Sequence, residues 1–392
     1  MTLWDKGGEA DARLARFTVG DDLALDRRLL RYDCRASLAH AQMLAAIGVL
    51  DAAELAGIAA ALAEIERLDA DGSFPFAPDD EDCHSAIERH LTERLGDAGR
   101  KIHTGRSRND QLLTALRLYE KDALAALARD AAALALALGE AIERFGAIEL
   151  PGYTHTRKAM PTTVRTWLGC FAAALGEDVE ELRHAAKRID RSPLGTAAGF
   201  GVPLLPVDRA MTARALGFAG IIDNPIHAQH GRGKLEAGIL HCCTQVLYDL
   251  NRLAADLILF SLPELGYVVL PERLCTGSSI MPHKRNPDAL ELVRAHYHAV
   301  VADEAKIKSI AASLPSGYSR DLQLTKAPLF AGIDATAACL AAMRIVVEGL
   351  AIDAAACRAG LTDELYATHR AYALVAQGVP FREAYRIVGR AT

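Results

Sequence analysis

A helical stretch of unusual length sets the architecture expected of this chain. Residues 106–138 contain neither Gly nor Pro, so they predict one continuous helix of about 50 Å at 1.5 Å per residue. Apolar residues within it and just beyond recur at alternating steps of three and four: Leu124, Leu127, Ala131, Leu134, Leu138, Ala141 and Phe145. This spacing is typical of the seam of a helix bundle or coiled coil, so the helix requires partner helices.

Four further stretches with a helical pattern can supply those partners. Connections that carry Pro and Gly separate them, and they cover roughly residues 162–190, 233–262, 287–313 and 327–350. The sequence therefore predicts an all-α fold with a central long-helix bundle at 106–350. A smaller helical domain at 1–105, with an apolar helix around 34–50, precedes the bundle, and a short helical domain at 351–392 follows it. Strands do not alternate with helices and no repeat is present, which argues against a Rossmann sheet or a solenoid.

Composition limits the partners and the compartment. The 392 residues are 51% hydrophobic and carry a formal net charge of −6, which argues against nucleic acid and favours a small-molecule substrate. The eight cysteines show no CxxC spacing and are expected to be buried thiols in a reducing compartment. The N-terminus lacks the order of a signal peptide, and no uninterrupted apolar run of about 18 residues occurs. We expect a soluble, cytoplasmic protein with no membrane partner.

The run at 277–287, Gly-Ser-Ser-Ile-Met-Pro-His-Lys-Arg-Asn-Pro, indicates a catalytic loop that closes over a substrate. Ser278 offers a hydroxyl, and Lys284 and Asn286 lie close behind it in the sequence. Pro287 suits the first position of a helix, whose N-terminal N–H groups would favour a carboxylate or developing negative charge. The alternative is a surface turn that leads into a helix.

Two other polar runs interrupt the apolar pattern. The first, residues 103–111, begins the long helix, where Ser107 or Asn109 could serve as an N-cap. Its arginines, Arg106 and Arg108, together with the hydroxyl and amide groups, would also suit a carboxylate receptor, and we favour this interpretation. The second run is Gly-Tyr-Thr-His at 152–155. His155 could be a structural histidine or an acid–base group oriented by Glu291.

A third polar segment, around residues 318–326, follows a Pro- and Gly-bearing connection. Its side chains of both signs would suit a substrate with amino and carboxylate groups, although a solvated helix start is the plainer alternative. His84 with Glu88, and His227 with His230, have spacings that a metal site could use, but neither pair belongs to a stronger metal motif. We predict no metal and no cofactor.

Together with residues 80–88, these runs resemble the fumarase/aspartase superfamily, and within it the argininosuccinate lyases. The resemblance spans nearly the whole chain. It implies an all-helical fold of three domains, a homotetramer with active sites shared between subunits, and a long seam buried between chains. The reaction that it implies is the anti β-elimination of argininosuccinate to L-arginine and fumarate.

The resemblance also implies roles for individual residues. Ser278 would remove the Cβ proton, and Lys284 and Asn286 would hold the carboxylate that takes up charge. His155, supported by Glu291, would assist protonation of the leaving nitrogen. The succinyl carboxylates would be bound by Ser107, Arg108, Asn109 and Thr154. The amino-acid portion of the substrate would meet Tyr318, Gln323 and Lys326, with His84 lining the same cleft.

Several positions depart from the family pattern. Arg157 and Met160 replace two glutamines, and Asp22 replaces an early serine that contacts substrate. Residues 224–232 keep mainly their arginine, and members of the family usually continue beyond the position of Thr392. These departures leave open which amine is released. A related carbon–nitrogen lyase acting on another N-succinyl amine, a catalytically silent structural homologue and a bare helical scaffold are the alternatives.

Overall fold

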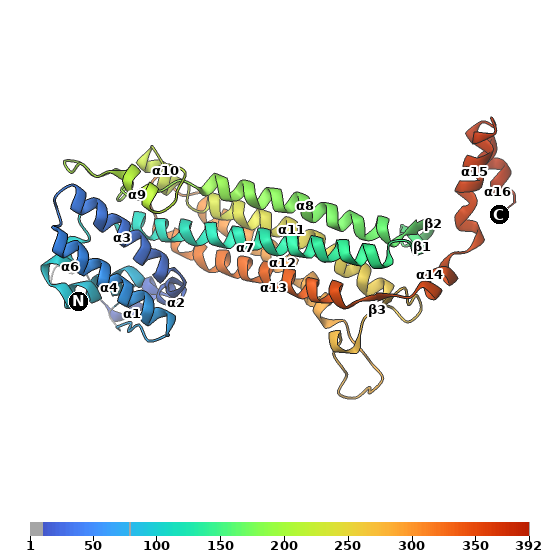
Figure 1. Ribbon diagram of the computed structural model, residues 1–392, viewed down its shortest axis with the longest axis horizontal. Coiled ribbons are helices and arrows are strands. Elements are labelled where there is room, and N and C mark those ends of the chain that lie inside the picture. The colour runs from blue at the N-terminus through green and yellow to red at the C-terminus, as the bar shows by residue number, and fades with distance from the viewer. Residues whose placement is uncertain (1–10, 78–79, 392) are drawn as a thin grey trace. The chain divides into compact units, whose positions relative to one another are not determined.

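The computed structural model describes residues 11–77 and 80–391. The first ten residues, on which the signal-peptide expectation was based, lie outside this range. The described chain is predominantly helical (Figure 1), which confirms the predicted all-α class. It divides into two compact units. Unit 1 comprises Met1–Ala126, Leu182–His241 and Ala302–Ala331, and unit 2 comprises Leu127–Glu181, Cys242–Val301 and Gly332–Thr392. The division into three domains stays a prediction.

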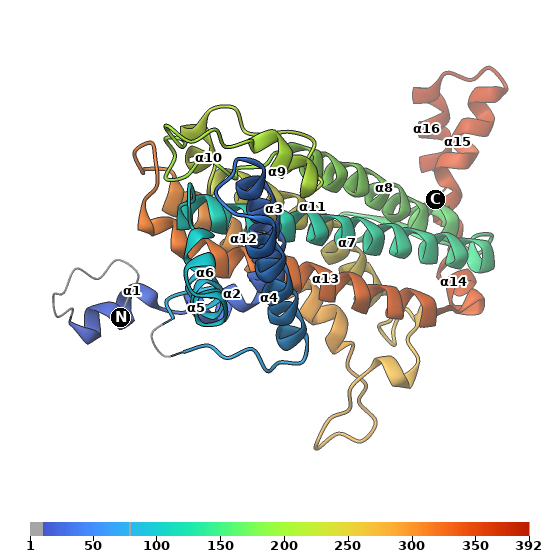
Figure 2. The ribbon, with the colours of Figure 1, turned by 60° about the vertical axis from the view of Figure 1, so that its left-hand side comes forward.

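Five long helices correspond to the five predicted stretches. Their bounds are α7 Arg108–Phe145, α8 Val164–Ile189, α11 Lys234–Phe260, α12 Asp288–Ala311 and α13 Lys326–Gly349. Each helix contributes residues to both units, and within each unit the segments run side by side (Figures 1 and 2). Pro287 immediately precedes α12 instead of occupying its first position, and its carbonyl accepts hydrogen bonds from Leu290 and Glu291.

The apolar seam of α7 is buried within a single chain. Leu134, Leu138 and Ala141 are 0% exposed, and Leu127 is 1% exposed. The expectation that this seam is buried between chains is therefore wrong. The other long helices of the same chain pack against the apolar side of α7 and cover the seam.

Short helices complete unit 1. They are α1 Ala12–Val19, α2 Asp22–Asp26, α3 Leu30–Ala46, α4 Ala52–Ala70, α5 Cys83–Leu95, α6 Asp97–Lys101, α9 Arg209–Ala215 and α10 Pro225–His230, with 3₁₀ turns at 27–29 and 320–325. Asp51 and Asp82 begin α4 and α5, where their carboxylates accept backbone N–H bonds in capping boxes. Such caps satisfy N–H groups that have no partner inside the helix. The apolar helix predicted around 34–50 starts and ends a few residues earlier, as α3.

Unit 2 contains a β-hairpin that the sequence did not predict. Strand β1, Glu149–Thr154, pairs antiparallel with β2, Arg157–Thr163. The two turn residues, His155 and Thr156, both have positive φ, 51° and 58°, as a two-residue hairpin turn of this kind requires. The turn lacks the Asn-Gly or Asp-Gly sequence that usually indicates such a turn.

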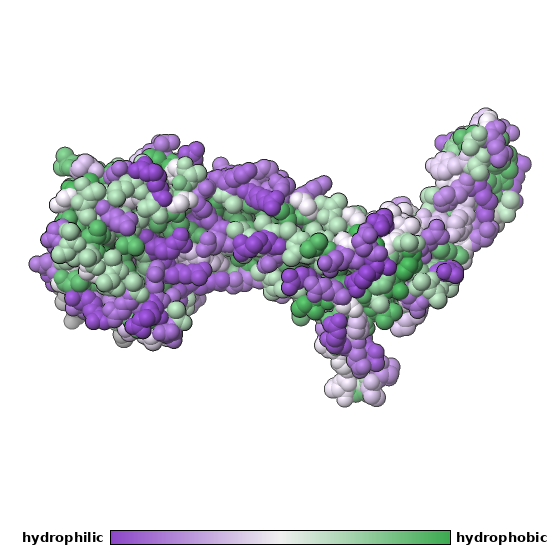
Figure 3. Space-filling model, viewed as in Figure 1, coloured by the Kyte–Doolittle hydropathy of each residue, from purple (hydrophilic) through white to green (hydrophobic). Residues whose placement is uncertain are grey.

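The remaining elements of unit 2 are short. They are β3 Val268–Val269, paired with β4 Ala351–Ile352, then α14 Ala354–Gly360, α15 Ala367–Ala376 and α16 Phe381–Gly389, with 3₁₀ turns at 272–274 and 363–366. A long connection between β3 and α12 projects from the helices of its own unit (gold in Figure 1). The space-filling view in Figure 3 shows hydrophilic and weakly polar residues along it.

The cysteines differ in their exposure to solvent. Five of the cysteines are buried, but Cys170 is exposed and Cys242 and Cys275 are half-buried, so the prediction that all are buried is wrong for these three. Cys170 lies on the outer side of α8 instead of its core side.

The segment Arg320–Gly349 is apolar and long enough to cross a membrane, with a mean hydropathy of 1.7 in its most apolar window. Half of that window is buried inside the protein, as in a core helix.

Candidate active site

A buried histidine–aspartate pair lies in unit 1. Nδ1 of His84 is 2.6 Å from Oδ2 of Asp33, and both side chains are almost fully buried. Burial alone would lower the pKa of His84, but the Asp33 carboxylate outweighs it and the pKa is raised. Nε2 of His84 has no hydrogen-bond partner among the described residues. This nitrogen is therefore available to a ligand, and it donates an N–H when the ring is protonated.

Asp33 has a full set of partners. The Gln111 amide donates to its two oxygens at 3.0 and 3.1 Å, and Arg106, which donates to Ser37 Oγ at 2.8 Å, adds positive charge nearby. Burial raises the pKa of Asp33, but His84 and Arg106 reverse this effect, so its pKa is lowered. Sequence reasoning missed Asp33. The available signal was a lone carboxylate within the apolar pattern of α3.

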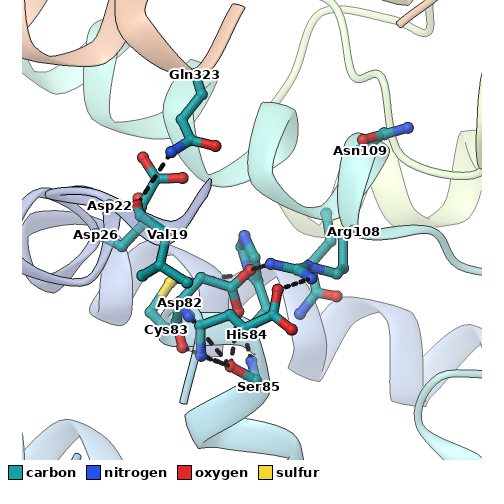
Figure 4. Close-up of polar contacts among 12 residues, drawn as sticks. Val19, Asp22, Asp26, Asp82, Cys83, His84, Ser85, Arg108, Asn109 and Gln323 are labelled. Atoms are coloured by element: carbon teal, nitrogen blue, oxygen red, sulfur yellow. Dashed lines mark hydrogen bonds and ion pairs between the residues drawn. The ribbon is translucent and has the colours of Figure 1, made fainter. Parts of the chain in front are cut away.

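Arg108 is paired within its own chain. Its guanidinium donates to Glu81 at 2.8 Å and to Asp82, the N-cap of α5. Ser107 caps α7, because its Oγ accepts from the Asn109 N–H at 3.3 Å. The Asn109 side chain points away from the Arg108–Asp82 pair (Figure 4). The N-cap interpretation of Ser107 is thus confirmed. The carboxylate receptor stays a prediction, and in it a substrate carboxylate would bind Arg108 together with Glu81 and Asp82.

Lys326, at the start of α13, joins two carboxylates of α2. Its ammonium lies 2.5 Å from Asp26 Oδ1 and 2.7 Å from Asp22 Oδ1, and it is 1% exposed. Burial would lower the pKa of Lys326, but the two carboxylates raise it. Asp22 therefore places a second negative charge beside Lys326. Asp26 was also missed from the sequence.

The segment before α13 is bound to the N-terminal helices. Gln323 donates to the carbonyls of Thr18 and Val19, each at 3.0 Å, and Figure 4 shows it beside Asp22 and Val19. Tyr318 is half-exposed, and the Arg232 guanidinium lies 5.0 Å from its ring centroid. Unit 1 therefore brings together one part of the predicted site: His84, Ser107, Arg108, Asn109, Tyr318, Gln323 and Lys326.

The metal-ligand candidates predicted from spacing do not form ligand sets. Glu88 lies 3.4 Å from His103 Nδ1 instead of joining His84. The structure does place donor atoms of Asp26, Cys83 and His84 within 4.8 Å of one another. However, the ammonium of Lys326 already binds Asp26, and burial raises the pKa of the Cys83 thiol well above its usual value. A cation and a protonated thiol make this a poor metal site.

Unit 2 holds the other predicted residues on the hairpin, on the loop before α12 and, for Glu291, in the first turn of α12. Thr154 ends β1 and His155 follows it in the hairpin turn. The hairpin is fixed by Lys158, which donates to the Gly360 carbonyl at 2.6 Å, and by a 3.1 Å hydrogen bond between the hydroxyls of Tyr153 and Tyr267. Among the residues that the structure describes, no hydrogen bond or ion pair joins His155 to Glu291. Their pairing stays a prediction.

The loop before α12 is closed at its base. Thr276 and Asn286 exchange two backbone hydrogen bonds of 2.9 and 3.0 Å. Within the loop, Ser278 Oγ accepts N–H bonds from Met281 at 3.1 Å and from Ile280 at 3.4 Å, while Lys284 is exposed to solvent. These bonds make Ser278 Oγ the acceptor of a local turn.

Comparison with known proteins identifies the family and the fold. The family described as lyase matches residues 5–302, and the family described as argininosuccinate lyase C-terminal matches residues 364–392. The crystal structure of EDDS lyase in complex with formate has a TM-score of 0.83 and is 28% identical, covering 97% of this chain and 76% of that chain. A fumarate lyase from Mesorhizobium sp. BNC1, with a TM-score of 0.77 at 20% identity, shares the fold over 97% of this chain and 86% of that chain. Fold and family match together define a lyase of the fumarase/aspartase superfamily.

Similarity over the full length narrows the class. An argininosuccinate lyase of Thermotoga neapolitana is 50% identical over 386 residues, which cover 98% of this chain and 97% of the relative. One of Sorangium cellulosum is also 50% identical, over 99% of this chain and 90% of the relative. The chain belongs to the argininosuccinate lyase family.

Proposed function

We propose that this protein cleaves argininosuccinate to L-arginine and fumarate by anti β-elimination, as a cytoplasmic enzyme of arginine biosynthesis that uses no cofactor. The observation that carries the proposal is the 50% identity with argininosuccinate lyases over nearly the whole length of both chains. The loop at 277–287 and the buried charges of unit 1 supply suitable chemistry.

In this proposal Ser278 removes the Cβ proton of the succinyl group. Its two N–H donors support the alkoxide form, and Lys284 and Asn286 stabilise the carboxylate that takes up charge. His155, supported by Glu291, assists the departure of the leaving nitrogen. The succinyl carboxylates are held by Ser107, Arg108, Asn109 and Thr154, and His84 lines the same cleft with its unpaired Nε2. Tyr318, Gln323 and Lys326 contact the amino-acid portion.

We also propose that the enzyme is a homotetramer whose active sites combine residues of different subunits. Large apolar side chains on α11 and α12 in unit 2 support association: Tyr248 is 43% exposed, Leu259 37%, Leu292 61% and Val301 39%. Exposed apolar residues at neighbouring positions on two helices indicate a surface that another chain covers.

The test is a product assay. The purified protein is incubated with argininosuccinate, and arginine and fumarate are quantified. Equal amounts of both products, absent from a Ser278→Ala control, would support the assignment. The absence of turnover with argininosuccinate and with every other N-succinyl amine would favour the silent structural homologue.

One observation favours the second candidate, a lyase that releases fumarate from another N-succinyl amine. Asp22 adds a carboxylate beside Lys326, where the amine portion is proposed to bind. The added charge would favour an amine with a further positive group. Turnover of another N-succinyl amine with a higher kcat/KM than argininosuccinate would establish this alternative.

A further inference from the structure

A single buried carboxylate joins two distant segments of unit 1. Asp110, in the first turn of α7, is 0% exposed. Its Oδ1 accepts the backbone N–H of Ser107 at 2.9 Å, and its Oδ2 accepts those of Gly195 at 2.9 Å and Ala197 at 2.8 Å. A buried carboxylate is costly unless it is hydrogen-bonded, and these bonds satisfy both oxygens. Asp110 therefore connects the start of α7 to backbone that lies 85 residues further along the chain.

The bond from Ser107 fixes the turn that carries the predicted carboxylate receptor. Ser107 Oγ accepts the N–H of Asn109 at 3.3 Å, and Asp110 accepts the N–H of Ser107 in return, in the manner of a capping box. Figure 4 shows that the Arg108 and Asn109 side chains point to different sides of this turn. Because the backbone of a helix determines where its side chains point, the geometry of the receptor depends on this bond.

The other end of the connection is a rigidly held glycine-rich segment, residues 195–201. Positive φ at Gly195 (83°) and at Ala197 (51°) turns both N–H groups toward the same carboxylate oxygen. On its other side, the Arg209 guanidinium donates to the Leu194 carbonyl at 3.1 Å. A Cβ atom added at Gly195 would lie 2.7 Å from Cγ of Arg209. The segment is therefore a fixed support with no room to shift.

We propose that Asp110 is a positioning residue, which sets the geometry of the carboxylate receptor by tying it to the segment 195–201. The inference rests on the proposed function, in which Ser107, Arg108 and Asn109 hold the succinyl carboxylates. It goes beyond that function, because Asp110 acts through Ser107 and does not touch the substrate itself.

Asp110→Asn is the sharpest substitution, because it keeps the shape of the side chain. A carboxylate offers two acceptor oxygens, whereas an amide offers one oxygen and one N–H donor group. The amide nitrogen of the variant would face the N–H of Ser107 or the two N–H groups of Gly195 and Ala197. One of the two connections must therefore break.

Calorimetric titration of the full chain with fumarate tests this role, because fumarate carries two carboxylates and no amine. We expect saturable binding to the wild-type protein. Asp110→Asn should weaken it about tenfold, the size expected when one hydrogen bond to a charged ligand is lost. In a Ser107→Ala background the same substitution should cost less, because Asp110 acts through Ser107.

Two controls separate positioning from a general loss of stability. Asp51→Asn changes a carboxylate that caps α4 with two N–H bonds of 2.8 Å, and it should leave fumarate affinity unchanged. Gly195→Ala should weaken fumarate binding, because its methyl group would displace the segment from Arg209. Gly217→Ala is its matched control, since Gly217 also has a positive φ, 71°, but a Cβ there would meet nothing within 4 Å. If Asp110→Asn fails to fold, the two glycine variants still decide.

Kinetics with argininosuccinate give a readout that a purely structural role would not move. Asp110→Asn should raise KM about tenfold with little change in kcat, because the receptor binds the ground state and the transition state alike. The proposal is overturned if Asp110→Asn and Gly195→Ala both retain wild-type fumarate affinity, or if Asp110→Asn costs the same with and without Ser107. Fumarate binding without turnover of argininosuccinate would contradict the proposed function, and the fumarate titrations would still decide the role of Asp110.

Discussion

The buried ionised side chains of unit 1 are stable because opposite charges lie beside them. Asp33 lies beside His84, and Lys326 lies beside Asp22 and Asp26. Removal of one partner from either group would leave an uncompensated buried charge. His84 and Lys326 could be selected from sequence motifs. Their partners could not, because Asp33 is 51 residues from His84 and Asp26 is 300 residues from Lys326 along the chain, and no local pattern encodes such a distance.

Asp33→Asn should lower the free energy of unfolding by about 3 kcal/mol near neutral pH. The pKa of His84 is raised in the folded protein. Its contribution to the free energy of unfolding is therefore complete below the pKa of the unfolded state, and it is lost as the pH rises through the pKa of the folded state. The contribution of Asp33, whose pKa is lowered, is lost as pH falls through its folded pKa. Urea unfolding at a series of pH values should therefore show the largest loss of stability from Asp33→Asn between the folded-state pKa of Asp33 and that of His84.

Asp71→Asn is the control for this experiment. Asp71 forms an exposed i,i+4 pair with Arg67, so its substitution should cost less than about 0.5 kcal/mol. A cost for Asp33→Asn as small as that of the control, or one that does not vary with pH, would contradict the prediction.

Ser278→Ala should lower kcat by about 10³-fold or more, since proton transfer by a positioned group typically contributes 10²–10⁴-fold. Substrate binding should be nearly unchanged, because the loss concerns the transition state. Fumarate absorbance gives the rate, and calorimetry gives the affinity. Ser279→Ala, which removes the neighbouring exposed hydroxyl, should retain most activity. Full activity of Ser278→Ala would remove Ser278 from its role.

At the scale of elements, the long helices could be predicted to within a few residues. The periodic apolar pattern identified them, and Pro and Gly marked their ends. The hairpin at 149–163 could not be predicted, because its turn is His155-Thr156 and Pro151 and Pro161 lie opposite each other in its strands, whereas Pro normally argues against a strand. The loop that leads into α12 could be predicted, but the two backbone hydrogen bonds at its base could not.

Leu134→Ala in α7 should cost about 3 kcal/mol of stability, because it leaves a cavity at a position that is 0% exposed. Leu136→Ala, on the same helix at 66% exposure, should cost less than about 0.5 kcal/mol. Guanidinium unfolding of both variants measures the difference. Equal costs would show that the seam is not the core of the bundle.

At the scale of the whole molecule, the seam of α7 gives no evidence for association between chains, because it is buried within one chain. The evidence for association comes instead from the exposed apolar residues of α11 and α12. The proposed tetramer also accounts for a site whose residues occur on separate parts of one chain. The sequence pattern could not distinguish a seam covered by the same chain from one covered by another, since both bury the same periodic residues.

Sedimentation equilibrium should give a mass of about four times the 42.0 kDa of one chain. Leu292→Glu should shift this mass toward smaller species, because a carboxylate would be buried in the interface. Leu136→Glu, a comparably exposed position on α7, serves as the control and should leave the mass unchanged. A monomeric native protein would contradict the shared active site.

The pair of backbone hydrogen bonds between Thr276 and Asn286 has a consequence for turnover. Because the two ends of the segment are already joined, a substrate that draws Ser278 inward need not supply the entropy of bringing those ends together. The segment would move as a tethered flap, and its rate of opening would depend on a few backbone torsions near residues 276 and 286. The rate of product escape would then depend on the stiffness of this junction.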